Sequence, residues 1–156
     1  MRAGTPDGVT SLAPLALRVF IYDWLLARGF PPTAAEIGTA FGVPVDTAKL
    51  ALGDLKVGKT VLVHPMTGEI WMAGPFASAP TPYLVAGSKA TWFANCAWDM
   101  LGVAVIANEP VRIETACTDC GEPMLLHADP RTGTGDDACV HFLVPARRWY
   151  DDIAFT

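Results

Sequence analysis

The stretch TAAEIGTAFGVPVDTAKLALGDLKVGKTVLVHPMTGEIWM, residues 33–72, carries the clearest structural signals in this chain. It opens with a capping box, in which the Thr33 hydroxyl accepts a backbone N–H bond at the start of a helix and Glu36 binds the cap residue in return. Apolar residues then repeat at helical spacing, and Gly42 ends the pattern. A helix is therefore predicted between Thr33 and Gly42.

The remainder of this stretch predicts a further helix and a β-hairpin. Asp46 can cap a helix that carries several leucines and ends at Gly58. Two short apolar runs follow, residues 61–63 and 70–72, around a turn at residues 66–69. Runs of this length, rich in β-branched and aromatic side chains and joined by a turn with glycine, are typical of a hairpin.

One more helix precedes this stretch. Between Leu12 and Leu26, apolar side chains recur at three- and four-residue spacing, and Gly29 can end the helix before a Pro-Pro pair. Residues 1–11 are rich in Gly, Pro, Thr and Asp, which indicates a loose terminus. Three helices followed by a hairpin is the order of a winged helix, so residues 12–74 are predicted to form a winged-helix-like domain.

Winged helices often bind DNA, and the charge of this region bears on that function. Between residues 33 and 60, three lysines are balanced by three acidic residues: Lys49, Lys56, Lys59, Glu36, Asp46 and Asp54. The whole chain has a net charge of −5 and a pI near 5.0. Because phosphate binding needs a concentrated positive surface, we expect no nucleic-acid partner and a structural or lid-like role for this domain.

Composition places further bounds on the protein. The chain has 156 residues, of which 51% are hydrophobic, so it can bury a core in one domain or two small ones. No apolar run of about 18 residues is free of charge or proline, and a membrane-spanning helix is not expected. Asp7 and Asp23 flank and interrupt the first apolar stretch, which argues against a secretory signal. We therefore expect a cytoplasmic protein whose four cysteines are reduced.

The second half of the chain has a different pattern, with a boundary expected near Pro75. Residues 74–89 hold several prolines, glycines and serines, and are interpreted as a linker or an extended, strand-like crossing. The segments beyond it are predicted to be a helix at 91–102, an apolar run at 103–107, strands at 111–115, 124–127 and 139–144, and a loop at 129–137. The fold class is therefore α+β, with a small α+β domain at residues 75–156 whose sheet is mainly antiparallel.

Cys96 and Asp99 are the candidate reactive pair. Residues three apart on a helix share a face, so the thiol and the carboxyl group can exchange a proton. A cysteine near the helix start lies at the positive end of the dipole, which favours the thiolate. Large apolar neighbours, Trp92 and Trp98 among them, would desolvate the carboxyl group and raise its pKa. The plainer alternative is a small buried cysteine beside a surface acid.

Cys117 and Cys120 form a Cys-x-x-Cys motif beside Gly121. Such a pair is half of a zinc knuckle or a redox pair, and the sequence has no second pair of this kind. His127 and His141 complete a zinc site only if folding brings them to the two cysteines. Taken singly, each histidine is more often a structural group than a ligand.

Several segments of the sequence resemble the alkylmercury lyase family. The most specific is the block Asn-Cys-Ala-Trp-Asp at residues 95–99, and the others lie at residues 75–83, 117–123, 140–142 and 149–153. The resemblance covers nearly the whole chain from the first helix onward, including the winged-helix-like part.

In that family, two cysteines and an aspartate cut a carbon–mercury bond by protonolysis, which yields a hydrocarbon and Hg(II). The resemblance assigns the first catalytic cysteine to Cys96, a transient mercury ligand, and the catalytic aspartate to Asp99. It gives Cys117 and its neighbour Cys120 a structural role. It also implies a small organomercurial substrate, no cofactor, external thiols such as glutathione that remove Hg(II), and mercuric reductase as a partner that accepts Hg(II).

The second catalytic cysteine of the family follows directly after a segment like residues 151–156, where this sequence ends. The strand and helix that come next in the family are absent too, so we expect a chain truncated at its C-terminus, or another thiol in this role. Cys139 is the nearest candidate in sequence, although an alternating strand could equally bury it. Two other functions stay open: a catalytically impaired thiol protein that binds heavy metals, and a winged-helix regulator.

Overall fold

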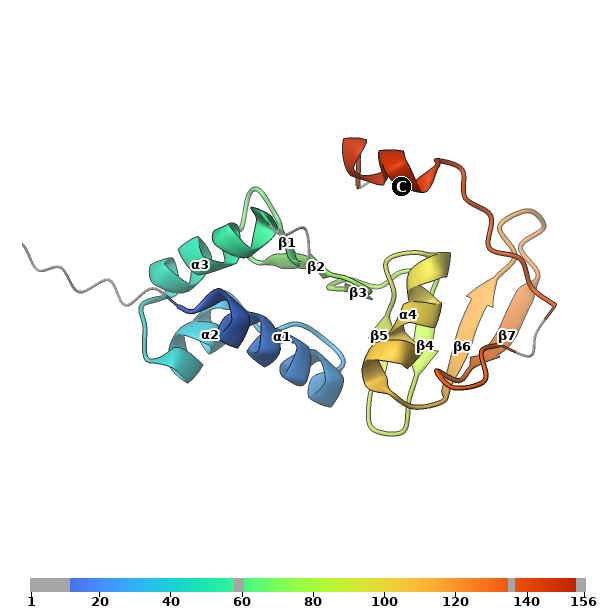
Figure 1. The fold of residues 1–156 in the computed structure, drawn as a ribbon, viewed down its shortest axis with the longest axis horizontal. Coiled ribbons are helices and arrows are strands. Elements are labelled where there is room, and N and C mark those ends of the chain that lie inside the picture. Colours follow the sequence, from blue (N-terminus) through green and yellow to red (C-terminus); the bar gives the residue numbers. More distant parts are fainter. Residues whose placement is uncertain (1–11, 58–60, 135–136, 154–156) are drawn as a thin grey trace, which may run out of the picture.

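The structure is a computed structural model that describes residues 12–57, 61–134 and 137–153. A helical N-terminal part comes first in the chain, and two antiparallel sheets, one more helix and a short 3₁₀ helix follow it (Figure 1). The predicted α+β class is therefore confirmed.

Three helices make up the N-terminal part: α1 (Pro14–Arg28), α2 (Ala34–Phe41) and α3 (Val45–Val57). The predicted end of α1 is confirmed, since Gly29 adopts the left-handed conformation (φ 83°) and its N–H binds the Leu25 carbonyl. In the described ranges, no helix has both the length and the apolar character that a membrane crossing requires.

The predicted capping box at the start of α2 is also confirmed. The Glu36 N–H donates to the Thr33 hydroxyl over 3.2 Å, and the Thr33 N–H donates to the Glu36 carboxylate over 2.8 Å. The predicted cap at Asp46 is wrong, because the Ala48 N–H binds the Pro44 carbonyl at 3.1 Å and α3 begins before the acid. Asp46 lies instead in the first turn, where a carboxylate interacts favourably with the helix dipole.

The predicted hairpin consists of β1 (Val61–Val63) and β2 (Ile70–Ala73), which pair antiparallel. A third strand, β3 (Phe76–Ala77), extends this sheet in the order β1-β2-β3. Both β3 and β4 (Leu84–Ala86) lie within residues 74–89, so of the two alternatives expected there, the extended, strand-like crossing is found and not the linker. These short strands are stabilised by partners that lie elsewhere in the chain, and local composition does not identify those partners.

The second sheet has the strand order β5-β4-β6-β7, and every neighbouring pair is antiparallel. Its further strands are β5 (Thr91–Phe93), β6 (Val111–Ala116) and β7 (Pro123–Ala128), and the helix α4 (Ala97–Ala107) follows β5 in the chain. The strands predicted where β6 and β7 lie are confirmed.

Two predicted elements of the second half are wrong. The helix expected over residues 91–102 begins only at Ala97 and continues through the apolar run 103–107, because the residues before it pair with β4 as the strand β5. The strand expected at residues 139–144 does not form, since this segment makes no ladder with another strand. Its side chains pack against the start of α4 instead, with Phe142 in ring contact with Trp98.

One cluster of buried apolar side chains connects the helices with both sheets. Phe76 and Trp92 are its largest fully buried members, and their ring centroids lie 6.1 Å apart. The Trp92 indole N–H donates to the Leu25 carbonyl oxygen over 2.8 Å, which connects β5 to the end of α1. The division into domains at residues 12–74 and 75–156 stays a prediction.

Candidate active site

Cys96 and Asp99 lie at the N-terminal end of α4, about one helical turn apart. Cys96 is the N-cap residue, with an extended backbone (φ −150°, ψ 177°), and its carbonyl accepts a helical bond from the Met100 N–H at 3.1 Å. Asp99 belongs to the first turn of the helix, and both side chains are half-buried. The predicted position of the thiol near a helix start is therefore confirmed.

Hydrogen bonds to a neighbouring loop fix the chain just before the helix. The Asn95 N–H donates to the Pro75 carbonyl over 3.1 Å. The Thr81 hydroxyl donates to the Ala94 carbonyl over 2.7 Å. Because these two bonds hold the residues that precede Cys96, the direction in which the chain enters α4 is set by contacts outside the helix.

Burial raises the pKa of the Cys96 thiol above its ordinary value. The backbone N–H groups of Asp99 and Trp98 lower this pKa, while the negative charge of the Asp99 carboxylate raises it. Burial is the largest of these effects, so the expected preference for a thiolate at the helix start is outweighed. At neutral pH the sulfur therefore carries its proton.

Burial also raises the pKa of the Asp99 carboxyl group. Hydrogen bonds with the Asn95 amide and the Cys96 thiol lower this pKa, but the effect of burial is larger. The Asn95 side-chain oxygen is buried and has no hydrogen-bond partner among the described residues. The raised pKa suits a group that must accept a proton and give it back.

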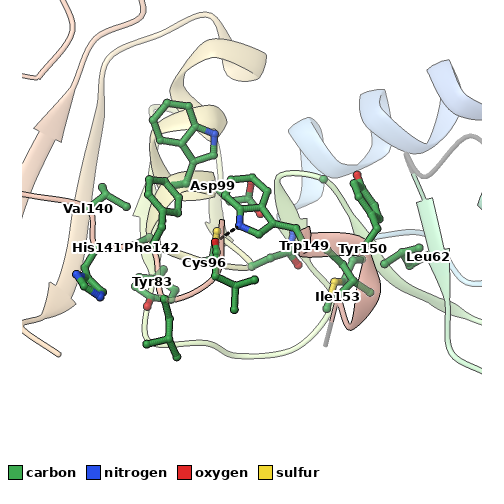
Figure 2. Close-up of a pocket in the computed structure, with 17 residues that line it drawn as sticks. Leu62, Tyr83, Cys96, Asp99, Val140, His141, Phe142, Trp149, Tyr150 and Ile153 are labelled. Atoms are coloured by element: carbon green, nitrogen blue, oxygen red, sulfur yellow. Dashed lines mark hydrogen bonds between the residues drawn. The ribbon is translucent and has the colours of Figure 1, made fainter. Parts of the chain in front are cut away.

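The two side chains line a cavity of about 520 Å³ (Figure 2). Its walls come from the start of α4, from the first sheet and from the C-terminal segment. Most of its large lining side chains are aromatic or apolar: Leu62, Tyr83, Trp98, Phe142, Trp149 and Tyr150. Among the described residues, Cys96 is the single cysteine that lines it. A thiol and a carboxyl group thus lie together in an apolar cavity.

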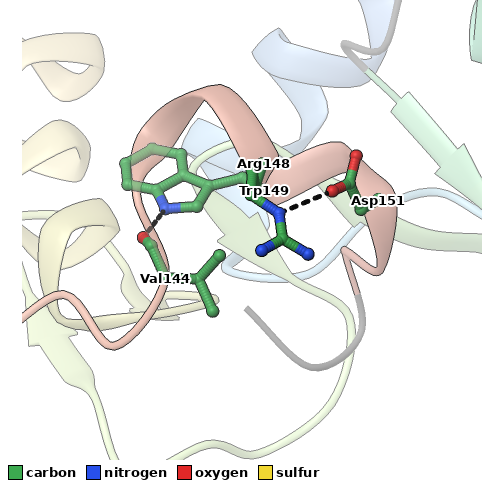
Figure 3. A network of polar contacts seen from close by, with 4 residues as sticks. All are labelled: Val144, Arg148, Trp149 and Asp151. Atoms are coloured by element: carbon green, nitrogen blue, oxygen red, sulfur yellow. Dashed lines mark hydrogen bonds and ion pairs between the residues drawn. The ribbon is translucent and has the colours of Figure 1, made fainter.

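The C-terminal segment forms one wall of the cavity, a position that was not predicted from the sequence. It ends in the 3₁₀ helix η1 (Ala146–Asp151), where the Trp149 indole N–H donates to the Val144 carbonyl at 2.8 Å. An Arg148–Asp151 ion pair of 3.0 Å lies on the same turn (Figure 3). The Phe142 ring contacts both Trp98 and Trp149, with centroids 6.0 and 5.3 Å apart. The sequence signal that could have indicated this wall is the aromatic content of the segment, which holds Phe142, Trp149 and Tyr150.

The other cysteines lie outside this cavity. Cys117 and Cys120 occupy the turn between β6 and β7, and Cys139 is exposed and absent from the cavity lining. All four cysteines are free thiols. The described residues contain no cluster of three or more His, Cys, Asp or Glu that could hold a metal, so the histidines do not complete a zinc site with the Cys-x-x-Cys motif. The role of Cys139 as a second thiol stays a prediction.

Comparison with known proteins gives two matches. Residues 76–156 match the sequence model of a family described as alkylmercury lyase. The fold is similar to a solved structure titled "Crystal structure of the mercury-bound form of MerB2", with a TM-score of 0.60 and 19% sequence identity over 80% of this chain. The match covers 60% of that protein, and at this identity it shows a common fold alone. No curated protein is significantly similar in sequence.

Proposed function

Since the chain belongs to the alkylmercury lyase family, we propose that it is an organomercurial lyase, which cleaves a carbon–mercury bond by protonolysis to a hydrocarbon and Hg(II). One observation carries this proposal: a thiol and a carboxyl group lie a helical turn apart in the same apolar cavity. Catalysis is assigned to Cys96 and Asp99. The substrate is a small organomercurial, already bound to an external thiolate.

Cys96 supplies the ligand for mercury. Thiolate is the soft donor that a soft metal prefers over nitrogen and oxygen. Because burial raises the pKa of this thiol, its attack requires a base that removes the proton as the sulfur–mercury bond forms. Asp99, whose carboxyl group interacts with the same thiol, is that base.

Asp99 then returns the proton. Once the mercury carries two thiolates and the organic group, the bound carbon is more basic, and the carboxyl proton passes to it as the carbon–mercury bond breaks. The raised pKa of Asp99 keeps the proton on the carboxyl group until that point. The hydrogen that began on the Cys96 sulfur ends on the hydrocarbon, and mercury keeps both thiolates.

The apolar walls serve the organic group of the substrate. Trp98, Phe142 and Trp149 border the cavity and contact one another as a row of rings. Contact with these rings removes apolar substrate surface from water, and it limits the access of water to the carboxyl proton. The cavity thus favours a hydrocarbon substituent over a charged one.

Product release needs thiols from solution. One thiol displaces Cys96 from mercury, takes the metal away as a dithiolate and returns the proton to the Cys96 sulfur. No resident cofactor takes part in this scheme. A reduced compartment such as the cytoplasm supplies the thiols, and a mercuric reductase would consume the Hg(II).

Release of benzene from phenylmercuric acetate, measured by headspace gas chromatography with excess glutathione, tests the function. We expect the wild-type chain to release benzene, and Cys96→Ser and Asp99→Asn to lose this activity. Asp54→Asn is the matched control, because this acid lies on the exposed face of α3. Unchanged turnover in either site variant would rule out the assigned roles. Loss of activity in Cys139→Ser would identify Cys139 as the second thiol.

A second candidate function is heavy-metal binding without catalysis. It is favoured by the fact that Cys96 is the single cysteine lining the cavity in the described part of the chain. It predicts that organomercurial binds to Cys96 and stays intact. Bound mercury without any hydrocarbon, at every glutathione concentration, would support this function over the lyase.

A further inference from the structure

The turn between β6 and β7 holds two thiols side by side. It is closed by hydrogen bonds from the Cys117 N–H to the Glu122 carbonyl and from the Gly121 N–H to the Cys117 carbonyl, both 2.9 Å. Gly121 adopts the left-handed conformation (φ 74°) that closes such a turn without strain. The side chains of Cys117 and Cys120 hydrogen-bond to each other. The thiol pair is therefore already assembled.

The environment of this pair differs from that of Cys96. Backbone N–H groups of Cys120 and Asp119 point at the Cys117 sulfur and lower the pKa of its thiol, the opposite of the effect of burial on Cys96. Cys120 is exposed and Cys117 is partly exposed, so both can be reached from solution. Preformed N–H donors around a sulfur stabilise a thiolate, which is the form that binds metal.

The strand pairing places this turn at the same end of the second sheet as the chain that leads into α4. Leu84 on β4 pairs with Phe93 of β5 on one side and with Glu114 of β6 on the other. Because β4 separates them, these two residues lie about 10 Å apart. Since β5 and β6 both pair antiparallel with β4, these two strands run in the same direction and end on the same side of the sheet. Cys96 and Cys117 each follow three residues later in the chain, beyond that end.

We propose that Cys117 and Cys120 form a second, two-coordinate mercury site that receives Hg(II) from Cys96. The inference rests on the proposed lyase function, which supplies the metal. A zinc ion would need two more ligands, and no cluster of three or more His, Cys, Asp or Glu that could hold a metal occurs within residues 12–57, 61–134 and 137–153. Hg(II) is satisfied by two thiolates. The pair therefore fits this soft ion better than it fits zinc.

The transfer is a ligand exchange without redox change. After the carbon–mercury bond breaks, Hg(II) is bound to the Cys96 sulfur and to one external thiolate, and the turn thiols take the place of the solution thiol that would otherwise displace Cys96. Two new bonds form from mercury to the Cys117 and Cys120 sulfurs, and the two earlier mercury–sulfur bonds break. The protons that the turn thiols release pass to the Cys96 sulfur and the external thiolate, so Cys96 is ready for another substrate.

Mercury retention in the Cys96→Ser background tests the site separately from catalysis. This variant is loaded with one equivalent of HgCl₂ and then dialysed against glutathione. A second thiol beside the first acts at a millimolar or higher effective concentration, so glutathione at about 0.1 mM competes poorly with an intact pair. Bound metal is measured by mass spectrometry, and the mercury–thiolate absorbance in the ultraviolet is recorded on the same sample.

We expect Cys96→Ser to retain about one mercury per chain, because the two turn thiols bind one Hg(II) together and dilute glutathione competes poorly with them. Adding either Cys117→Ser or Cys120→Ser is expected to abolish retention, and adding Cys139→Ser, the matched control, to leave it unchanged. Retention that survives loss of either turn thiol, or that depends on Cys139, would overturn the proposal. So would stoichiometric zinc binding that excludes mercury.

The lyase and this site can fail independently. If the wild-type chain releases no benzene but the turn thiols retain mercury, the proposed function fails and the metal site stands. If the wild-type chain releases benzene, but the Cys96→Ser/Cys117→Ser variant retains as much mercury as Cys96→Ser, the proposed metal site is wrong and the proposed lyase function stands.

Discussion

The indole N–H of Trp92 donates to the carbonyl oxygen of Leu25 over 2.8 Å, in the buried interior between β5 and α1. The same carbonyl accepts the N–H of Gly29 at 2.9 Å, so one oxygen both ends the helix and holds the strand. The chain reaches Cys96 four residues after Trp92. The contact therefore fixes the strand that leads into the candidate active site.

Replacing Trp92 by phenylalanine should destabilise the fold by roughly 1–3 kcal/mol, because a buried hydrogen bond is lost and a cavity is left where the larger ring was. Urea unfolding followed by circular dichroism measures this change. Trp24→Phe is the control, since the indole nitrogen of Trp24 is buried without a hydrogen-bond partner among the described residues. Equal losses in the two variants would show that the bond to Leu25 contributes nothing.

Replacing Gly29 by alanine should be more harmful than the same change at Gly42. Both glycines end helices in the left-handed conformation, where a side chain costs about 1–2 kcal/mol. At Gly29 a Cβ atom would also collide with the backbone carbonyl of Thr91, whereas nothing lies within 4 Å of one at Gly42. Thermal unfolding of the two variants gives the comparison. A smaller loss for Gly29→Ala would mean that α1 and β5 do not pack this closely.

The Asp99→Asn variant should be more stable than the wild-type chain at neutral pH. Burial raises the pKa of Asp99, so the unfolded chain loses this proton first as the pH rises above about 4, and the charged carboxylate then disfavours folding. The gain should be small near pH 4 and grow until the pH passes the folded-state pKa.

Urea unfolding at several pH values measures this gain. The control is Asp54→Asn, at an exposed position on α3. A gain that is independent of pH, or a loss at neutral pH, would show that Asp99 is not destabilised by burial.

Iodoacetamide should modify Cys117 before Cys96 at neutral pH. Backbone N–H groups lower the pKa of Cys117, whereas burial raises that of Cys96, and alkylation requires the thiolate. Peptide mass spectrometry after short exposures gives the order. The Asp99→Asn variant should react faster at Cys96, because the carboxylate contributes to the raised pKa of that thiol. Modification of Cys96 first in the wild-type chain would contradict both pKa directions.

Much of the N-terminal fold could be predicted because its signals are local. The capping box at Thr33 and the glycine at the end of α1 act on residues within one helical turn, and both appear as predicted. Strand pairing is different, since β4 is stabilised by β5 and β6 on either side. The proline- and glycine-rich composition of residues 74–89 was compatible with a linker or with an extended, strand-like crossing, and it did not indicate that β4 lies in the middle of a sheet.

The candidate site was predictable in part for the same reason. The Cys96–Asp99 spacing is local, and the structure brings both side chains to one cavity. The opposite wall of the cavity depends on a contact between residues far apart in the sequence. Phe142 forms part of this wall because its ring packs against Trp98 at the start of α4. Periodicity within residues 139–144 favours a strand and carries no information about that contact.

The row of rings around the cavity gives the protein an optical property of its own. Two of the five tryptophans, Trp98 and Trp149, border the space where mercury would bind. A heavy atom close to an indole promotes intersystem crossing and quenches its emission. Binding of mercury in the cavity can therefore be followed in real time by intrinsic tryptophan fluorescence, without a label and with all four native cysteines in place.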